Sequence, residues 1–165
     1  MTSKPPLGRK AEHQKLIAFP LANHRVALPL QSVLRVLHHQ LEDNDDSLNA
    51  MGLLQIGHYV IRAINLYQWL TPGPSPQPPF LIIVRGPTGE PVGVWADDLP
   101  DLVELSPDSL RSLPPSAIAA SRFLGLMSHA AVISDGGENR TVFLLNISQA
   151  LNTHPPDGAA LPSRV

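Results

Sequence analysis

GLLQIGHYVIRAINLYQWL, residues 52–70, is the stretch that decides how this chain folds. It begins with two short β-rich runs, Leu53 to Ile56 and Tyr59 to Ile64. The pair Gly57-His58 separates them, and a glycine-containing pair between two such runs predicts a tight hairpin.

A helix cap follows the second run. The Asn65 side-chain oxygen can accept N–H groups that the first turn of a helix leaves unpaired. Leu66, Trp69 and Leu70 are spaced at i, i+3 and i+4, so a helix here has one apolar face. The whole stretch therefore predicts strand, tight turn, strand, cap and short helix.

The same arrangement recurs near the end of the chain. Residues 146–151, NISQAL, align with residues 65–70, NLYQWL, and an apolar hairpin is predicted before each of them. Earlier segments correspond more loosely, as two further apolar hairpins that are each followed by spaced Val and Leu: residues 16–30 with Val33, Val36 and Leu37, and residues 80–96 with Leu99, Leu102 and Val103. Four corresponding segments in one order predict two similar β-rich lobes.

The composition suggests where the ordered domain lies. Residues 1–14 are polar with two adjacent prolines, and residues 152–165 turn to Pro, Gly, Ala and Ser, so we expect a disordered arm and a flexible tail. Residues 71–79, TPGPSPQPP, favour an extended conformation and fall between the two repeats. We therefore expect one domain over residues 15–151. Its first lobe would span about 26–79 plus the N-terminal strand, the second about 80–151, and the proline run would connect them.

Charge and cysteine content narrow the possible functions. The 165 residues are 43% hydrophobic and 16% charged, with a net charge of −2, so no global field would attract nucleic acid. The absence of cysteine excludes disulfides and thiolate metal sites and is compatible with a reducing compartment. The sequence has neither a secretion signal nor an apolar run of about 20 residues, so we expect a cytoplasmic protein.

Motifs for catalysis are missing from the sequence. The seven histidines show no HExxH spacing, Gly86-Pro-Thr-Gly89 lacks the Gly-Lys-Ser/Thr of a phosphate loop, and no GxSxG occurs. Adjacent Asp97-Asp98 would diverge on a strand and most simply ends one. We therefore expect no enzyme, no cofactor and no metal.

The order of these motifs resembles the CheW-like domain, the coupling module of bacterial chemosensory systems, from about Leu16 to Leu151. The resemblance is carried by LIAFPLANHRVALPL before Val33-Leu-Arg-Val36, by Gly52-Leu-Leu-Gln-Ile and Val60-Ile-Arg-Ala-Ile-Asn-Leu66, by Val92-Gly-Val-Trp-Ala-Asp97, and by Phe143-Leu-Leu-Asn-Ile147. It implies a mainly β fold of two five-stranded, SH3-like barrels with short helices.

The resemblance also implies a function. Such a chain would be a non-enzymatic adaptor that couples the cytoplasmic tip of a chemoreceptor to a CheA-type histidine kinase, and it would be recruited from the cytoplasm to receptor arrays. One lobe would pack on a barrel domain of the kinase, and the groove between lobes would hold the receptor's helical hairpin. The contact residues expected in the first lobe are Val33, Arg35, Val36, Gly57, His58, Tyr59 and Arg62.

At four sites, five residues of this chain depart from the usual family pattern. Members commonly carry an acidic residue at Arg35, Arg-Gly at Gly57-His58, proline at Arg62 and aspartate at Asn65. The changes at Arg35 and Gly57 remove both members of a charge pair. A divergent system controlling pilus motility or phototaxis is therefore as plausible as flagellar chemotaxis. Two alternatives stay open: a small-molecule sensor or enzyme that uses the inter-lobe cleft, and a decayed regulator that binds only one partner.

Overall fold

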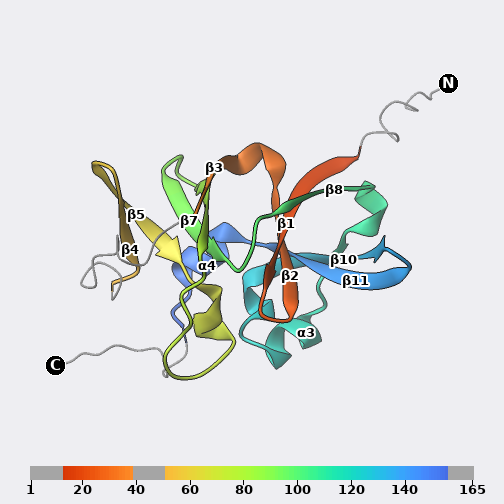
Figure 1. Ribbon diagram of the computed structural model, residues 1–165. Helices are drawn as coiled ribbons and strands as arrows, with labels where there is room; N and C mark the ends of the chain where they lie inside the picture. Colours follow the sequence, from red (N-terminus) through yellow and green to blue (C-terminus); the bar gives the residue numbers. More distant parts are fainter. Residues whose placement is uncertain (1–12, 39–50, 156–165) are drawn as a thin grey trace.

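The computed structural model describes residues 13–38 and 51–155, which form two β-sheets with short helices beside them (Figure 1). Sheet A consists, in order, of β8 (Asp101–Leu105), β1 (Gln14–Leu21), β2 (His24–Pro29), β11 (Glu138–Leu145), β10 (Met127–Asp135) and β9 (Arg111–Ser112). Sheet B consists, in order, of β3 (Val33–His38), β6 (Phe80–Arg85), β7 (Pro91–Ala96), β5 (Tyr59–Ile64) and β4 (Leu53–Ile56). The predicted two-lobed, mainly β fold is confirmed, with a two-residue sixth strand in sheet A.

Short helical segments link the strands. They are η1 (Leu30–Ser32), η3 (Leu66–Trp69), η4 (Pro107–Ser109), α3 (Pro115–Ala120), η5 (Leu124–Leu126) and α4 (Ile147–Asn152). Among the described residues, no helix has the length and apolar character needed to cross a membrane. The predicted arm and tail lie largely outside the described residues.

The predicted repeat is present, but the two halves exchange hairpins. Hairpin β1–β2 from the first half lies in sheet A beside β8 and β10–β11 from the second half. Hairpin β6–β7 from the second half lies in sheet B beside β3 and β4–β5. In each sheet a parallel pair joins the two hairpins, β2 with β11 and β5 with β7. Apart from β9, the two sheets thus have corresponding strand orders, and each sheet contains strands from both halves of the chain.

This exchange corrects the lobe boundaries predicted from the sequence. Strands β6 and β7 belong with β3 to β5, so residues 80–96 are not part of a separate second lobe. The proline run at residues 71–79 leads from η3 to β6 within sheet B, and it does not connect the sheets. The chain instead crosses between sheets at η1 and at residues 97–100. An apolar hairpin has no local feature that specifies its neighbour, so its sequence could not show this.

The largest apolar core lies between the two sheets. It includes Phe19, Leu28, Ile82, Val94 and Phe123, all at most 2% exposed. A second cluster around Leu16 and Leu105 fills the interior of sheet A, and a third around Leu81 and Trp95 fills that of sheet B. Strands such as β6 are therefore buried on both faces, which explains their uninterrupted apolar sequences.

The two asparagines of the repeat cap their helices as predicted. The Asn65 side chain accepts a hydrogen bond from the Tyr67 N–H at 3.1 Å, and the Asn146 side chain accepts one from the Gln149 N–H at 3.1 Å. The helix after Asn65 is a 3₁₀ turn, whereas the helix after Asn146 is α-helical. Both turns bury apolar side chains against the inter-sheet core.

Glycine at position 93 leaves room for the sheet B interior. A Cβ atom there would lie 2.7 Å from Leu81 Cδ1, and Leu81 is fully buried. We expect Gly93→Ala to lower the free energy of unfolding by about 1–3 kcal/mol, because Leu81 must move within a packed core. Chemical denaturation measures the change.

Gly125→Ala is the matched control for this substitution. Its added Cβ would meet nothing closer than Ile118 Cγ2 at 3.9 Å, so we expect less destabilisation than at position 93. Equal stability of the two variants would contradict the packing of Leu81 against Gly93.

Candidate protein-binding site

The described residues expose strand edges and apolar side chains that a partner protein could bind. Within residues 13–38 and 51–155, no group of three or more His, Asp or Glu side chains is placed to hold a metal. Side chains exposed on strand edges are a different kind of candidate, because strand edges and apolar patches are what partner proteins bind.

The β4–β5 hairpin projects beyond the rest of sheet B (Figure 1). Strand β5 pairs with β7 only through residues 62–64, so Tyr59 to Ile61 lie beyond that pairing. Tyr59 is 74% exposed and Val60 is 55% exposed. Gly57 takes a φ of +60° in the turn, a conformation that glycine adopts without strain. The hairpin thus presents an aromatic and an aliphatic side chain beside an unpaired strand edge.

Arg62 has an intramolecular partner at the base of this hairpin. Its Nη2 donates a hydrogen bond to the carbonyl oxygen of Leu151 in α4, at 3.3 Å. This contact joins sheet B to the C-terminal end of α4, where a cation interacts favourably with the helix dipole. Sequence reasoning placed Arg62 only at an interface, and it could not reveal a bond across 89 residues.

The other expected contact residues lie on β3, an edge strand of sheet B. Val33 is half-buried and packs against the inter-sheet core. Val36 is exposed and lies opposite Ile82, which belongs to the same core. Val36 therefore extends the apolar surface of the inter-sheet core to the edge of sheet B. Arg35 is exposed and lies opposite Ile83 of the sheet B interior, after a register shift at Leu34.

The seven predicted residues therefore form two groups. Residues 57–59 and 62 lie on the β4–β5 hairpin, and residues 33, 35 and 36 lie on β3. Strands β6 and β7 separate the two groups in sheet B. The structure does not bring them together into one contact surface.

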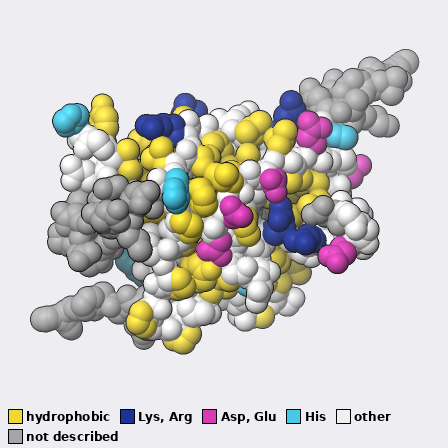
Figure 2. All heavy atoms as spheres, viewed as in Figure 1, with side chains coloured by type: hydrophobic (Ala, Val, Ile, Leu, Met, Phe, Trp, Pro, Cys, Tyr) yellow, Lys and Arg dark blue, Asp and Glu magenta, His cyan; other side chains and the backbone are white. Residues whose placement is uncertain are grey.

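Strand β8 supplies exposed apolar residues that sequence reasoning assigned no role in binding. Leu102 is 58% exposed and lies opposite Ile17, a residue of the inter-sheet core, and Leu99 in the preceding connection is 56% exposed. Hydrophobic side chains appear over the region between β3 and β8, with acidic groups among them (Figure 2). Their spacing was visible in the sequence, but only the sheet order shows that β8 is an edge strand.

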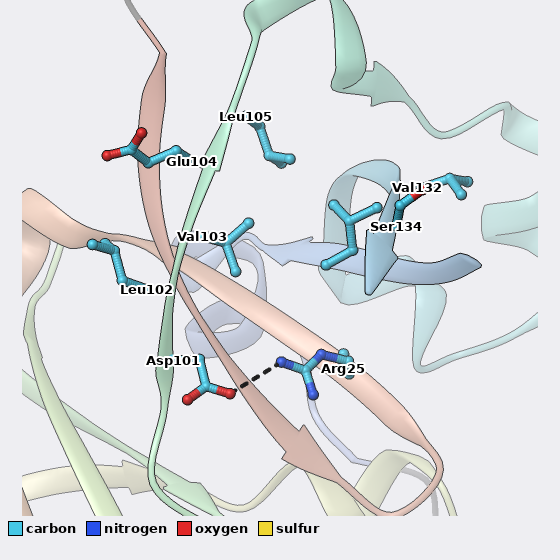
Figure 3. A pocket seen from close by; sticks show the side chains of 9 residues that line it. Arg25, Asp101, Leu102, Val103, Glu104, Leu105, Val132 and Ser134 are labelled. Atoms are coloured by element: carbon cyan, nitrogen blue, oxygen red, sulfur yellow. Dashed lines mark ion pairs between the residues drawn. The ribbon is translucent and has the colours of Figure 1, made fainter. Parts of the chain in front are cut away.

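A shallow cavity on sheet A lies at the edge of the same strand (Figure 3). Its volume is about 440 Å³, and β8 and residues 132–134 of β10 line it. Arg25 on β2 forms an ion pair with Asp101 at its margin, with a separation of 3.6 Å between Nη2 and Oδ2. This pair links the start of β8 to β2 across β1, the strand with which β8 is paired.

Tyr67 and Asp97 form a hydrogen-bonded pair where sheet B meets the β1–β2 hairpin of sheet A. The Tyr67 hydroxyl donates to Asp97 Oδ2 at 2.7 Å, and the backbone N–H of Ala22 donates to the same oxygen at 2.8 Å. Burial of the phenol raises the pKa of Tyr67 above its usual 10.0, and the hydrogen bond to Asp97 raises this pKa further.

This shift in pKa predicts how stability depends on pH. Because the pKa of Tyr67 is higher in the folded state than in the unfolded state, its contribution is fully present below about pH 10 and is lost as the pH rises through the folded-state value. Denaturation of wild type and Tyr67→Phe at about pH 8 and about pH 11 measures it. We expect the wild type to lose more stability than the variant, and equal losses would contradict the pair.

Comparisons with known proteins agree with this architecture. A family model described as the CheW-like domain matches residues 15–154. The crystal structure of the scaffolding protein TtCheW from Thermoanaerobacter tengcongensis is similar over 81% of this chain and 88% of that chain, with a TM-score of 0.55 and 16% sequence identity. A search of curated proteins found no match. Because the family match covers nearly all the described residues, the chain belongs to the CheW-like domain family, whose members are non-enzymatic scaffolds of chemotaxis signalling.

Proposed function

We propose that this protein is a cytoplasmic adaptor that couples the cytoplasmic tip of a chemoreceptor to a CheA-type histidine kinase. The observation that carries the proposal is a pair of separate exposed surfaces. One is the β4–β5 hairpin, and the other is the inter-sheet face, formed by the exposed side chains of Val36 on β3 and Leu102 on β8. Two surfaces allow two partners to bind at once, which is what a coupling protein requires.

The β4–β5 hairpin is the proposed kinase-binding surface. Tyr59 and Val60 expose apolar area, and the nearby backbone of β5 lies beyond its pairing with β7. A strand edge of this kind suits pairing with the edge of another barrel, and an exposed tyrosine suits the centre of an interface. Gly57 and His58 in the turn would lie at its rim.

The inter-sheet face is the proposed receptor-binding surface. Val36 and Leu102 extend the inter-sheet core outward from two edge strands, one in each sheet. An amphipathic helical hairpin offers a matching apolar face, and it has no need for a free strand edge. The two partners would therefore be distinguished by the kind of surface that they bind.

Titration with the regulatory barrel domain of the cognate kinase tests the first surface. We expect saturable binding and a roughly tenfold weaker affinity for Tyr59→Ala, because truncation of a buried interface aromatic removes about 1–3 kcal/mol. Val132→Ala, which shortens an exposed aliphatic side chain on β10 of sheet A, is the control and should leave the affinity unchanged. An unchanged affinity for Tyr59→Ala would remove the hairpin from the interface.

Binding of a soluble receptor hairpin tests the second surface. We expect Val36→Lys and Leu102→Lys each to weaken receptor binding by roughly tenfold, because each places a charge in an apolar contact. Neither change should affect kinase binding. Ile118→Lys, at an exposed aliphatic side chain of α3, is the control. If the wild type binds the kinase domain and not the hairpin, the protein is a regulator with a single partner.

A further inference from the structure

Asp97 joins segments of both sheets through one carboxylate oxygen. Besides Tyr67 and Ala22, which donate to its Oδ2, the Asp97 backbone N–H donates to the Pro20 carbonyl at 3.1 Å. Pro20 and Ala22 belong to the β1–β2 hairpin of sheet A, whereas Tyr67 and Asp97 follow strands of sheet B. These bonds therefore fix the two sheets to each other at one point.

The turn that receives Asp97 has an unusual backbone conformation. Ala22 has a φ of +54°, in the left-handed region that residues with a Cβ atom seldom adopt. Its N–H donates to Asp97 Oδ2 at 2.8 Å and lies 3.2 Å from the Tyr67 hydroxyl oxygen. A strained turn persists when its surroundings hold it in place, and here the surroundings are Asp97 and Tyr67.

Asp97 also lies directly after the end of β7, where the chain passes from sheet B to sheet A. The crossing connection comprises residues 97–100, after which Asp101 begins β8 and forms an ion pair with Arg25 of β2. The crossing is therefore anchored to the β1–β2 hairpin at both of its ends. Leu99 lies within the crossing, between these two contacts, and Leu102 follows it in β8, where it pairs with Ile17 of β1.

Burial of apolar area has no directional preference, and the packing of core side chains restricts the angle between the sheets without any polar contact. Hydrogen bonds at the margin of the core do have direction. We propose that Asp97 and Tyr67 are positioning residues that set the placement of β8 relative to β3, and thereby the affinity of the inter-sheet face for a receptor's helical hairpin. This inference rests on the proposed function for its ligand, and neither side chain is required to touch that ligand.

Binding of the receptor hairpin to Asp97→Asn and Tyr67→Phe tests the proposal. We expect both variants to bind roughly three- to tenfold more weakly, because a smaller fraction of molecules would have the binding-competent arrangement. Tyr67→Phe keeps the charge of Asp97, so a loss in both variants cannot come from charge alone. Unchanged affinity in both would overturn the proposal.

Asp98→Asn is the matched control. Asp98 is exposed, and its Oδ1 accepts a hydrogen bond from the Leu99 N–H at 2.8 Å within the crossing itself. It has the same charge as its neighbour, but among the described residues it makes no hydrogen bond to the β1–β2 hairpin. We expect the affinity of Asp98→Asn to remain near that of the wild type. A loss equal to that of Asp97→Asn would show that binding responds to charge and would overturn the positioning role of Asp97 and Tyr67.

Spin-label distances measure the arrangement of the sheets directly. The chain contains no cysteine, so Thr88→Cys in the β6–β7 turn and Val132→Cys on β10 place one label on each sheet. We expect a narrow distance distribution in the labelled wild type and in Asp98→Asn, and a broader one in Asp97→Asn and Tyr67→Phe. Weaker binding with an unchanged distribution would overturn a positioning role.

The two measurements separate this inference from the proposed function. If the wild type fails to bind the receptor hairpin, the proposed receptor surface is wrong, and the spin-label distances alone decide whether Asp97 and Tyr67 position the sheets. Thermal unfolding checks that each variant is folded. Should Asp97→Asn fail to fold, Tyr67→Phe, which removes one hydroxyl group, carries both measurements.

Discussion

Burial of strands on both faces is the constraint on which the rest of this structure depends. The exchange of hairpins between the two halves places β1 and β2 in one sheet and β6 and β7 in the other, so that each sheet turns one face to its own interior and one to the other sheet. The inter-sheet core then contains residues from both halves of the chain. Neither sheet could form from one half alone, because each lacks a hairpin that the other half supplies.

The same arrangement determines where partners can bind. Central strands in each sheet are used for packing, and the surfaces that remain are the edge strands and the projecting β4–β5 hairpin. Edge strands of soluble proteins are commonly protected by charges, and Arg35 on β3 and Glu104 on β8 are charged and exposed. On the same two strands, Val36 and Leu102 leave apolar area exposed on the face that carries the inter-sheet core. Such exposure in a small protein is typical of a surface that a partner covers.

In the part of the chain that the structure describes, directional polar contacts near the boundary of the two sheets lie at the margin of the apolar core. The buried core residues among those described are all apolar, so the core restricts the angle between the sheets through side-chain packing and not through hydrogen bonds. Asp97 with Tyr67, and Arg62 with the Leu151 carbonyl, are directional contacts at the margins of the core. Each joins elements from distant parts of the chain.

Local features of this protein were determined by the sequence alone: the hairpins, the asparagine caps at positions 65 and 146, the repeat and the family resemblance. Each depends on residues within a few positions of one another, through alternation of apolar side chains or a cap that bonds the next turn. The tertiary structure decided which sheet receives each hairpin, and so where the lobes divide. It also decided that β8 is an edge strand, that Arg62 bonds to Leu151, and that Asp97 joins the sheets rather than only ending a strand. These outcomes depend on pairing between segments tens of residues apart, and an apolar strand pattern fixes which face is buried without fixing which strand lies beside it.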